Sequence, residues 1–477
     1  MKKHPAILLA SLLTAATAYA SELRIGVATT DITPDKPVAL DGQFKTRISK
    51  GIDSPLTASA VAIEGLAEGQ KTDQVIFVSI DMIWIQPALL KSLRERLASS
   101  LPDFDGRKLI LTATHTHTAP VVQEGWYQIS TNGVMQPAEF KTFLLERLEQ
   151  VITHAWTNRQ SGGVSWGLGS AAIGYNRRPV YADGTAQMYG PTAVPEFRGI
   201  ENGADPGLET LFFWNGRQEL LAAGINVACP SQVKEHHSTI GADFWHDVRE
   251  QLQSGLSSNL CILGWPGAAG DISPHRVYYK AAEARMLKLR GSSLTQEIGR
   301  RISREVIDLH SLTHADIRTN LLFGHSVQTL TLPARKVTGE EAANAEREIA
   351  ELKQKNSKSL KIGWHEATLK RYKNQDQNPT FNVEIHVVRI GDVALTTSPF
   401  ELYQDFATQI KARSKAEQTL VLELTGGAAQ YLPTTRAVAG GGYGAIAQSN
   451  TGGPEAGQIL VDRTVEMIDL LWEQHPK

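Results

Sequence analysis

This sequence of 477 residues has few cysteines, no marked excess of either charge and few long apolar runs. Two cysteines, Cys229 and Cys261, are too few for a cysteine-rich zinc knuckle or a disulfide framework. Lys and Arg number 48 against 50 Asp and Glu, so no basic excess would neutralise a phosphate backbone, and we expect no nucleic-acid partner. What remains is an ordinary globular composition, which excludes a disordered, collagen-like or coiled-coil chain.

The first twenty residues have the pattern of an export signal. Lys2 and Lys3 precede an apolar run over 6–16, and Ala18-Tyr19-Ala20 resembles a signal-peptidase cleavage site. The run is too short for a permanent membrane-spanning helix, and no later stretch is apolar for long enough. We therefore expect a signal peptide at 1–20, a mature chain at 21–477 with no transmembrane segment, and a periplasmic or secreted location.

Apolar runs alternate with helical patterns along the mature chain, which predicts an α/β (mixed α+β) fold: one large catalytic domain with mixed β-sheets flanked by helices. Residues 161–207 are rich in Gly, Pro and Asn, which predicts a long structured loop. Residues 339–373 alternate Glu, Lys and Arg with Ala and Leu at helical spacing, which predicts an exposed helical excursion with a solvated face. Strands are predicted at 23–28, 75–84, 108–112, 211–214, 222–228, 260–263 and 381–397, and helices at 87–99, 137–156 and 459–472.

The strand predicted at 108–112 leads directly into Thr114-His115-Thr116-His117. In extended backbone, residues two apart point the same way, so both imidazoles can face one point. Open α/β sheets bind ligands at the carboxyl ends of strands, and neutral imidazole is a common metal ligand. The pair predicts a metal site, and the alternative is two surface histidines with structural hydrogen bonds.

A second group of polar residues follows the strand predicted at 222–228. Cys229, His236, His237 and Asp243 each have a side chain that could ligate zinc or orient a ligand. The alternative for the cysteine is a disulfide with Cys261, which an oxidising compartment would allow. The sequence leaves these alternatives open.

Three further segments carry side chains suited to a site. Asp271 and Ser273 lie in a turn bounded by glycine and proline, and they either act together or form an ordinary turn. Glu401 follows an apolar strand and is either a ligand or an exposed carboxylate. Tyr431 and Tyr443, the second preceded by three glycines, either line a pocket or pack in the core.

Taken in order, these segments resemble the catalytic domain of the neutral/alkaline, non-lysosomal ceramidase family, a group of zinc-dependent amidases. The family's second tyrosine also matches, at Tyr443, twelve residues after Tyr431. His275 stands where the family has asparagine, and we expect no counterpart of the family's C-terminal immunoglobulin-like domain. The matching segments are Thr30-Asp31-Ile32-Thr33-Pro34, Ala113-Thr114-His115-Thr116-His117-Thr118-Ala119-Pro120, Tyr175-Asn176-Arg177-Arg178, Ala269-Gly270-Asp271-Ile272-Ser273-Pro274, Pro399-Phe400-Glu401 and Tyr431-Leu432-Pro433-Thr434.

The resemblance implies a Zn²⁺ cofactor and a role for each matching residue. By this resemblance, His115, Glu401 and Tyr431 occupy zinc-ligand positions, and Ser273 stands at a serine implicated in catalysis. Asp271 is expected to orient Ser273 or another group of the site. The remaining family ligand is a histidine, and Cys229 stands at its position, so we expect Cys229, His236 or His237 to complete the metal site. The positions that hold or polarise the scissile amide correspond to His117, Arg177 and Tyr443.

The expected function is therefore an exported zinc-dependent hydrolase that cleaves the amide bond of a small-molecule or lipid-like N-acyl substrate. The departures from the family pattern leave room for a natural substrate other than ceramide. One alternative is an esterase or deacylase that acts on another acyl group. A second is a non-catalytic periplasmic binding protein that keeps the fold and has lost the metal.

Overall fold

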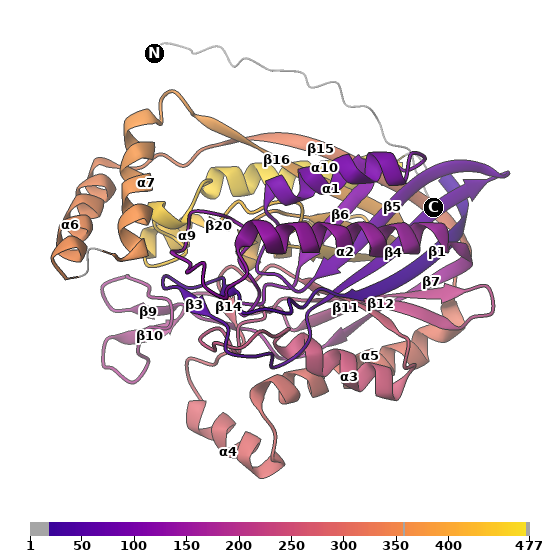
Figure 1. Cartoon of the computed structure of the whole chain (residues 1–477), viewed down its shortest axis with the longest axis horizontal. Helices are drawn as coiled ribbons and strands as arrows, with labels where there is room; N and C mark the ends of the chain where they lie inside the picture. The colour runs from indigo at the N-terminus through magenta and orange to yellow at the C-terminus, as the bar shows by residue number, and fades with distance from the viewer. Residues whose placement is uncertain (1–18, 356–357, 474–477) are drawn as a thin grey trace.

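The structure is a computed structural model that describes residues 19–355 and 358–473 (Figure 1). Residues 1–18 of the predicted signal peptide lie outside the described residues. Its last two residues, Tyr19 and Ala20, belong to strand β1 (Tyr19–Asp31), where they pair with Phe323 and Leu322. Within the described ranges, no helix is long and apolar enough to cross a membrane.

A mixed sheet of twelve strands forms the centre of the molecule. It runs in the order β13 (Cys261–Pro266), β12 (Leu220–Val227), β11 (Gly207–Asn215), β7 (Gln160–Ser170), β1, β15 (Asn320–Pro333), β16 (Thr380–Ile390), β17 (Val393–Thr397) and β19 (Gln418–Leu422). A branch from β1 adds β4 (Thr57–Ala67), β5 (Gln70–Ile80) and β6 (Leu109–Ala113). The pairs β5–β6, β12–β13 and β17–β19 are parallel, and the other pairs are antiparallel, which confirms the mixed α/β class.

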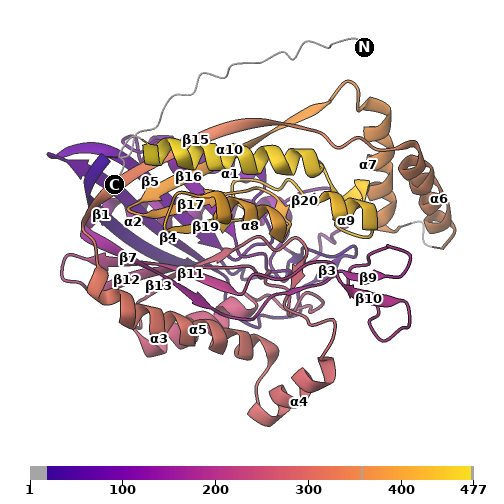
Figure 2. The same ribbon diagram turned by 180° about the vertical axis from the view of Figure 1, so that it is seen from behind.

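Helices cover the outer faces of this sheet (Figure 1, and Figure 2 from behind). The pair α1 (Pro87–Ser100) and α2 (Pro137–Thr157) packs on β4–β6, and α3 (Phe244–Gly255) and α5 (Leu294–Thr313) pack on β11–β13. The helices α8 (Gln404–Arg413) and α10 (Pro454–Glu473) pack on β15, β16, β17 and β19. The opposite face of the sheet is also buried, because strands far apart in its order pack together, as Phe77 and Trp265 do with ring centroids 5.6 Å apart.

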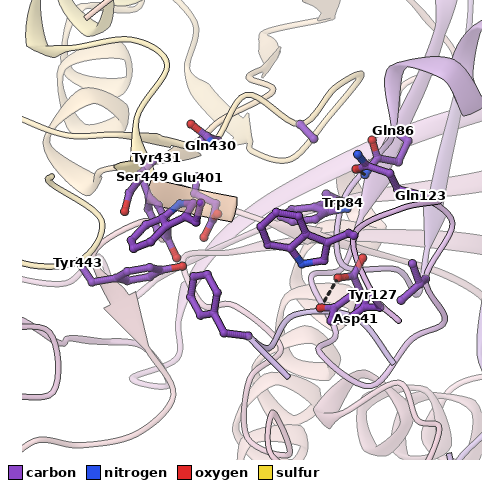
Figure 3. A pocket seen from close by; sticks show the side chains of 15 residues that line it. Asp41, Trp84, Gln86, Gln123, Tyr127, Glu401, Gln430, Tyr431, Tyr443 and Ser449 are labelled. Atoms are coloured by element: carbon purple, nitrogen blue, oxygen red, sulfur yellow. Dashed lines mark hydrogen bonds between the residues drawn. The ribbon is translucent and has the colours of Figure 1, made fainter. Parts of the chain in front are cut away.

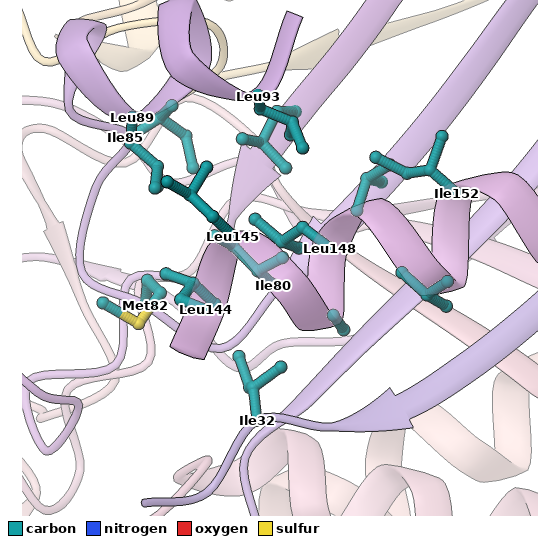
Figure 4. Close-up of a cluster of buried hydrophobic side chains, with 14 of the residues drawn as sticks. Ile32, Ile80, Met82, Ile85, Leu89, Leu93, Leu144, Leu145, Leu148 and Ile152 are labelled. Atoms are coloured by element: carbon teal, nitrogen blue, oxygen red, sulfur yellow. The ribbon is translucent and has the colours of Figure 1, made fainter. Parts of the chain in front are cut away.

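The spacing of apolar residues explains why α1 and α2 form and where they pack. Buried apolar residues, which are all leucines in α1, recur every three or four residues along both helices, so they form one apolar stripe on each. Figure 4 shows Leu89 and Leu93 of α1 and Leu144 and Leu148 of α2 pointing towards Ile80 at the end of β5. Burying each of these side chains contributes about 1.5–3 kcal/mol. Both predicted helices are confirmed, and each begins at a proline, which suits the first turn.

The loop predicted over 161–207 is wrong in its first part, because residues 160–170 form β7 between β1 and β11. The glycines that suggested a loop are needed by packing. A Cβ on Gly162 would lie 2.3 Å from the carbonyl oxygen of Trp214, and one on Gly163 would lie 2.8 Å from the carbonyl oxygen of Arg318. The rest of the segment carries only the short strands β8 (Tyr175–Asn176), β9 (Pro179–Tyr181) and β10 (Phe197–Ile200).

The helical excursion is confirmed as two helices, α6 (Gly339–Lys355) and α7 (Leu360–Asn374), which lie at one end of the molecule (Figure 1). Its description as a solvated face is incomplete. Ile362, His365 and Thr368 of α7 are buried, because this side of the helix packs on the segment that follows Tyr443.

Candidate active site

Most of the predicted site residues follow strands that end close together. Within each parallel pair, the two strands end at the same edge. Hydrogen bonds join the pairs to one another: Thr112 of β6 contacts Thr425, which follows β19, at 2.9 Å between hydroxyls, and Asn226 of β12 donates to the carbonyl of Val421 in β19 at 3.2 Å. The loops after β6, β12, β13, β17 and β19 therefore meet at one place.

The two imidazoles of the His-x-His segment face each other there, with their Nε2 atoms 3.2 Å apart. Nδ1 of His115 donates to the carbonyl of Ile83 at 2.7 Å, and Nδ1 of His117 donates to that of Gly42 at 3.1 Å. Since a carbonyl only accepts, each Nδ1 carries the proton, and both Nε2 lone pairs face the site. Burial lowers the pKa of His115 to about 4 and that of His117 well below its usual value, so both rings are neutral.

The extended backbone predicted for this segment is wrong. Strand β6 ends at Ala113, and His115 has a φ of 68°, in the left-handed region that non-glycine residues rarely adopt. This conformation turns the first imidazole onto the second, so the predicted convergence occurs by another route. Strained backbone of this kind costs on the order of 1–3 kcal/mol and clusters at functional sites.

A residue that sequence reasoning missed, Gln232, lies between the two imidazoles. Its Nε2 donates to Nε2 of His117 at 2.7 Å and lies 3.2 Å from Nε2 of His115, and its side chain is buried. Two facing lone pairs would repel, and the amide NH₂ offers a hydrogen to each of them. The only signal in the sequence is that Gln232 comes soon after β12, three residues beyond the expected ligand.

Cys229, His236 and His237 do not contact the imidazoles. The thiol of Cys229 is fully buried and contacts the carbonyls of Ile173 and Pro230, and burial raises its pKa well above the usual value. His236 is exposed beside Glu235, and His237 is also exposed. Cys261 lies in a different buried cluster, and both cysteines are free, so the expected alternative of a disulfide is wrong.

Glu401 and Tyr431 are direct partners in a small parallel ladder, β18 (Glu401–Leu402) and β20 (Tyr431–Leu432). Oε2 of Glu401 lies 3.7 Å from Nε2 of His115. Burial raises the pKa of Glu401 to about 7, against a hydrogen bond from Tyr431 and the charge of Arg177. Tyr443 packs against Tyr431 with ring centroids 5.5 Å apart, and burial raises the pKa of Tyr443 to about 12.

Arg177 lies beside these groups with its side chain buried. It donates to Oε1 of Gln232 at 3.1 Å, to the carbonyl of Gly270 at 3.0 Å and to the hydroxyl of Tyr431 at 3.4 Å. Burial opposes its charge, but the nearby hydroxyls of Tyr431 and Tyr189 and the carboxyl of Glu401 outweigh it, and the pKa of Arg177 is raised. The guanidinium therefore provides a fixed positive charge inside the site.

Ser273 lies behind Arg177 rather than beside the imidazoles. Its hydroxyl accepts a hydrogen bond from the hydroxyl of Tyr189 at 2.9 Å and another from the backbone NH of His275 at 3.0 Å. Tyr189 in turn accepts a hydrogen bond from Arg177 at 3.4 Å. Tyr189 is a second residue that nothing in the sequence singles out.

Asp271 contacts neither Ser273 nor the imidazoles through its carboxylate. It accepts hydrogen bonds from the side chain of Asn176 at 2.7 Å and from the backbone NH of Gln404, the first residue of α8, at 3.0 Å. Its carbonyl accepts from the backbone NH of Arg177 at 2.9 Å. Asp271 thus holds together the segments that carry Arg177 and Glu401.

The donors at this place fit a divalent metal in part. The imidazole of His115, the carboxylate of Glu401 and the phenol of Tyr431 are three neighbouring donors, and catalytic zinc keeps three protein ligands and one open position. Nδ1–H bonds to backbone carbonyls are the usual way of orienting a metal-binding imidazole. Across residues 19–355 and 358–473, no three His, Cys, Asp or Glu side chains are arranged to hold a metal ion by themselves, so a metal here requires the phenol or another donor.

A pocket of about 310 Å³ opens beside these donors (Figure 3). Figure 3 shows Glu401, Tyr431 and Tyr443 on one side of this pocket and Asp41 with Tyr127 on another. A smaller cavity next to it reaches His115 and His117. A substrate in the pocket can therefore contact the imidazoles, the carboxylate and the phenols together. The remaining residues along the pocket are Phe44, Trp84, Gln86, Val121, Gln123, Trp126, Trp364, Ala428, Gln430 and Ser449.

Comparison with known proteins identifies the fold. No model of a known protein family and no curated protein matches the chain. The solved structure of neutral ceramidase from Pseudomonas aeruginosa matches with a TM-score of 0.69 and 18% identity, over 96% of this chain and 76% of that one. A structure described as ceramidase complexed with C2 matches with a TM-score of 0.68 and 17% identity, over the same shares. The chain therefore has the fold of the neutral ceramidases.

Proposed function

We propose that this protein is an exported hydrolase that cleaves an amide bond of a lipid-like or other N-acyl substrate, with zinc as its cofactor. The observation that supports this most is the meeting of His115, Glu401, Tyr431 and Arg177 beside one pocket in a ceramidase fold. These residues come from four separate segments of the chain, so a chance arrangement of surface groups does not explain them. The resemblance found in the sequence assigns the same residues to one site.

In this proposal His115, Glu401 and Tyr431 hold the metal. When bound, zinc supplies a Lewis acid that polarises a carbonyl and lowers the pKa of a coordinated water. Arg177 and Tyr443 donate to the carbonyl oxygen as negative charge develops on it, and such a donor contributes about a hundredfold in rate. His117 contacts Gln232 and lies next to His115, where the Nε2 lone pair of its neutral ring can accept a hydrogen bond from the substrate.

Ser273 acts in this proposal as a positioning residue. Its hydroxyl fixes Tyr189, and Tyr189 fixes one end of the Arg177 guanidinium. Ser273→Ala should lower kcat moderately while Arg177→Met lowers it by about a hundredfold. A serine that itself attacked the substrate would instead make Ser273→Ala inactive and would leave a covalent acyl-enzyme in rapid-quench experiments.

The test is the substitution His115→Ala, assayed for bound metal and for release of amine from ceramide and from shorter N-acyl amines. We expect loss of both metal and activity. His236→Ala is the matched control, because this exposed histidine lies outside the pocket, and it should keep both. A His115→Ala protein with full activity would contradict the proposal, and turnover of esters alone would favour an esterase.

A second candidate, a binding protein without a metal, is favoured by one observation. The amide of Gln232 already donates to both imidazoles, which gives the site a hydrogen-bonded arrangement with no metal. Purified protein that contains no zinc after expression in zinc-supplemented medium, and that hydrolyses none of the substrates, would support this candidate.

A further inference from the structure

One wall of the pocket comes from the helical excursion, through Trp364 in the first half of α7. The Trp364 ring contacts Phe44 with centroids 5.2 Å apart and Tyr443 with centroids 5.9 Å apart. Phe44 and Tyr443 also contact each other, at 6.3 Å. Three rings from widely separated parts of the chain therefore form one continuous aromatic wall.

Helix α7 is fixed on both sides of the pocket. At its first residue, Leu360 packs against the cluster that contains Val121 and Tyr127. Near its other end, Arg371 donates to the carbonyls of Ala447 at 2.6 Å and Asn450 at 2.5 Å, in the segment that follows Tyr443. The helix thus bridges two walls, and Trp364 is held over the space between them.

The pocket presents ring faces rather than free polar groups. Asp41 already accepts hydrogen bonds from the backbone NH of Gly42 and from Tyr127. Gln86 and Gln123 bond to each other at 3.1 Å, and Figure 3 shows them together, away from Tyr443. A wall of aromatic rings with its polar neighbours already paired suits an apolar group.

The size of the pocket limits that group. Binding pockets for small molecules span about 300–1,000 Å³, so a pocket of about 310 Å³ is at the lower end of the range. Phe44, Trp364 and Tyr443 touch one another, so the wall they form has no gap between its rings. A short acyl group fits such a space better than an extended long chain.

We infer that Trp364 is a specificity-determining residue, which closes the pocket and selects N-acyl substrates with a compact, apolar acyl group. The inference rests on the proposed amidase function, because only an amidase would treat such N-acyl compounds as substrates. Its physical content, a pocket that accepts a short apolar chain and is closed by Trp364, can be measured by binding alone.

The experiment compares the wild type with Trp364→Ala and Trp364→Phe. Binding of straight-chain carboxylates from butanoate to hexadecanoate is measured by titration calorimetry, and each buried methylene should tighten binding by about fourfold. In the wild type we expect affinity to stop rising with added methylenes at a short chain, and in Trp364→Ala we expect it to keep rising to longer chains. Trp364→Phe, which keeps a ring, should lie between the two.

A control on the same helix is Tyr372→Ala, because Tyr372 does not line the pocket and should leave the wild-type profile unchanged. The inference is overturned if wild-type affinity keeps rising to hexadecanoate, if Trp364→Ala has the same profile, or if no carboxylate binds. The same series of N-acyl anilides then tests turnover. Binding with the expected cutoff but without turnover would overturn the proposed amidase function and leave the role of Trp364 intact.

Discussion

The side-chain oxygen of Gln232 accepts a hydrogen bond from Nη1 of Arg177 at 3.1 Å. A guanidinium only donates, so this contact fixes which end of the amide is oxygen and turns the NH₂ group towards His115 and His117. Gln232 therefore acts as a donor to the imidazoles, and its oxygen is not available to a metal in this arrangement.

The first prediction follows from this orientation. Gln232→His would replace a donor by a third imidazole between two neutral ones, and we expect zinc affinity to rise by about 10–100-fold, the scale of changes next to a metal's ligands. The measurement is competition for zinc against a chromophoric chelator. Because it reads metal affinity directly, it does not depend on knowing the substrate.

The control for this variant is Gln232→Leu, which removes the donor without adding a ligand. It should bind zinc at least as tightly as the wild type, because the amide no longer occupies the imidazole lone pairs. If Gln232→Leu instead loses zinc, the amide oxygen is a ligand and the orientation argued from Arg177 does not hold for the metal-bound protein.

A second prediction concerns Arg178, whose side chain is fully buried and pairs with Glu201 at 2.8 Å. Arg178 also donates to the carbonyls of Gly441 and Tyr443, so it anchors the glycine-rich segment that carries the pocket tyrosine. Arg178→Met leaves the buried carboxylate unpaired, which typically costs about 3–5 kcal/mol. Urea denaturation should show a clearly lower midpoint.

A matched control is Arg217→Ala, which breaks an exposed pair with Glu219 and should change stability by less than about 1 kcal/mol. Replacing both partners, in Arg178→Met with Glu201→Leu, should recover part of the loss, since no charge is then left unpaired. An unchanged midpoint for Arg178→Met alone would show that the pair is not stabilising.

The meeting of the site residues could be foreseen where it depends on strand ends. His115 follows β6 and Glu401 follows β17, and polar residues after buried strands gather at the edge of an α/β sheet. The aromatic wall could not be foreseen, because nothing in the local pattern of α7 shows that Trp364 crosses to Tyr443. Contacts between residues as far apart in the sequence as Trp364 and Tyr443 are set by packing rather than by local propensity.

The remaining ligand position shows a different limit. Counting along the sequence puts Cys229 at the position of the family's histidine and leaves His236 and His237 as alternatives, whereas Gln232 is the residue that reaches the imidazoles. The chain turns sharply after β12, and a three-residue difference in such a turn changes which side chain points into the core and which into the site. Spacing rules hold within regular elements and fail in turns of this kind.

A third prediction tests the position of that cysteine. Cys229→Ala should leave zinc content and substrate turnover within about twofold of the wild type, since the thiol is buried away from the imidazoles and burial raises its pKa, which disfavours the thiolate. Native protein should not react with a thiol reagent, and unfolded, unreduced protein should show two free thiols. Loss of zinc in Cys229→Ala would contradict this prediction and show that the thiolate of Cys229 is a zinc ligand.

The last prediction concerns acid stability and a carboxylate far from the pocket. Hydrogen bonds from Arg300, with Arg290 and Arg301, lower the pKa of Glu297 from 4.5 to about 2. A carboxyl whose pKa is lower in the folded state stabilises the protein at any pH above the pKa that it has in the unfolded chain. That contribution is lost as the pH falls through the pKa of the folded state. Glu297→Gln should therefore melt at a lower temperature than the wild type at pH 7, with the difference shrinking between about pH 4.5 and 2. Glu351→Gln, which breaks an exposed pair with Lys355, should change the melting temperature little at pH 7. A difference for Glu297→Gln that stays constant with pH would assign its effect to packing instead of charge.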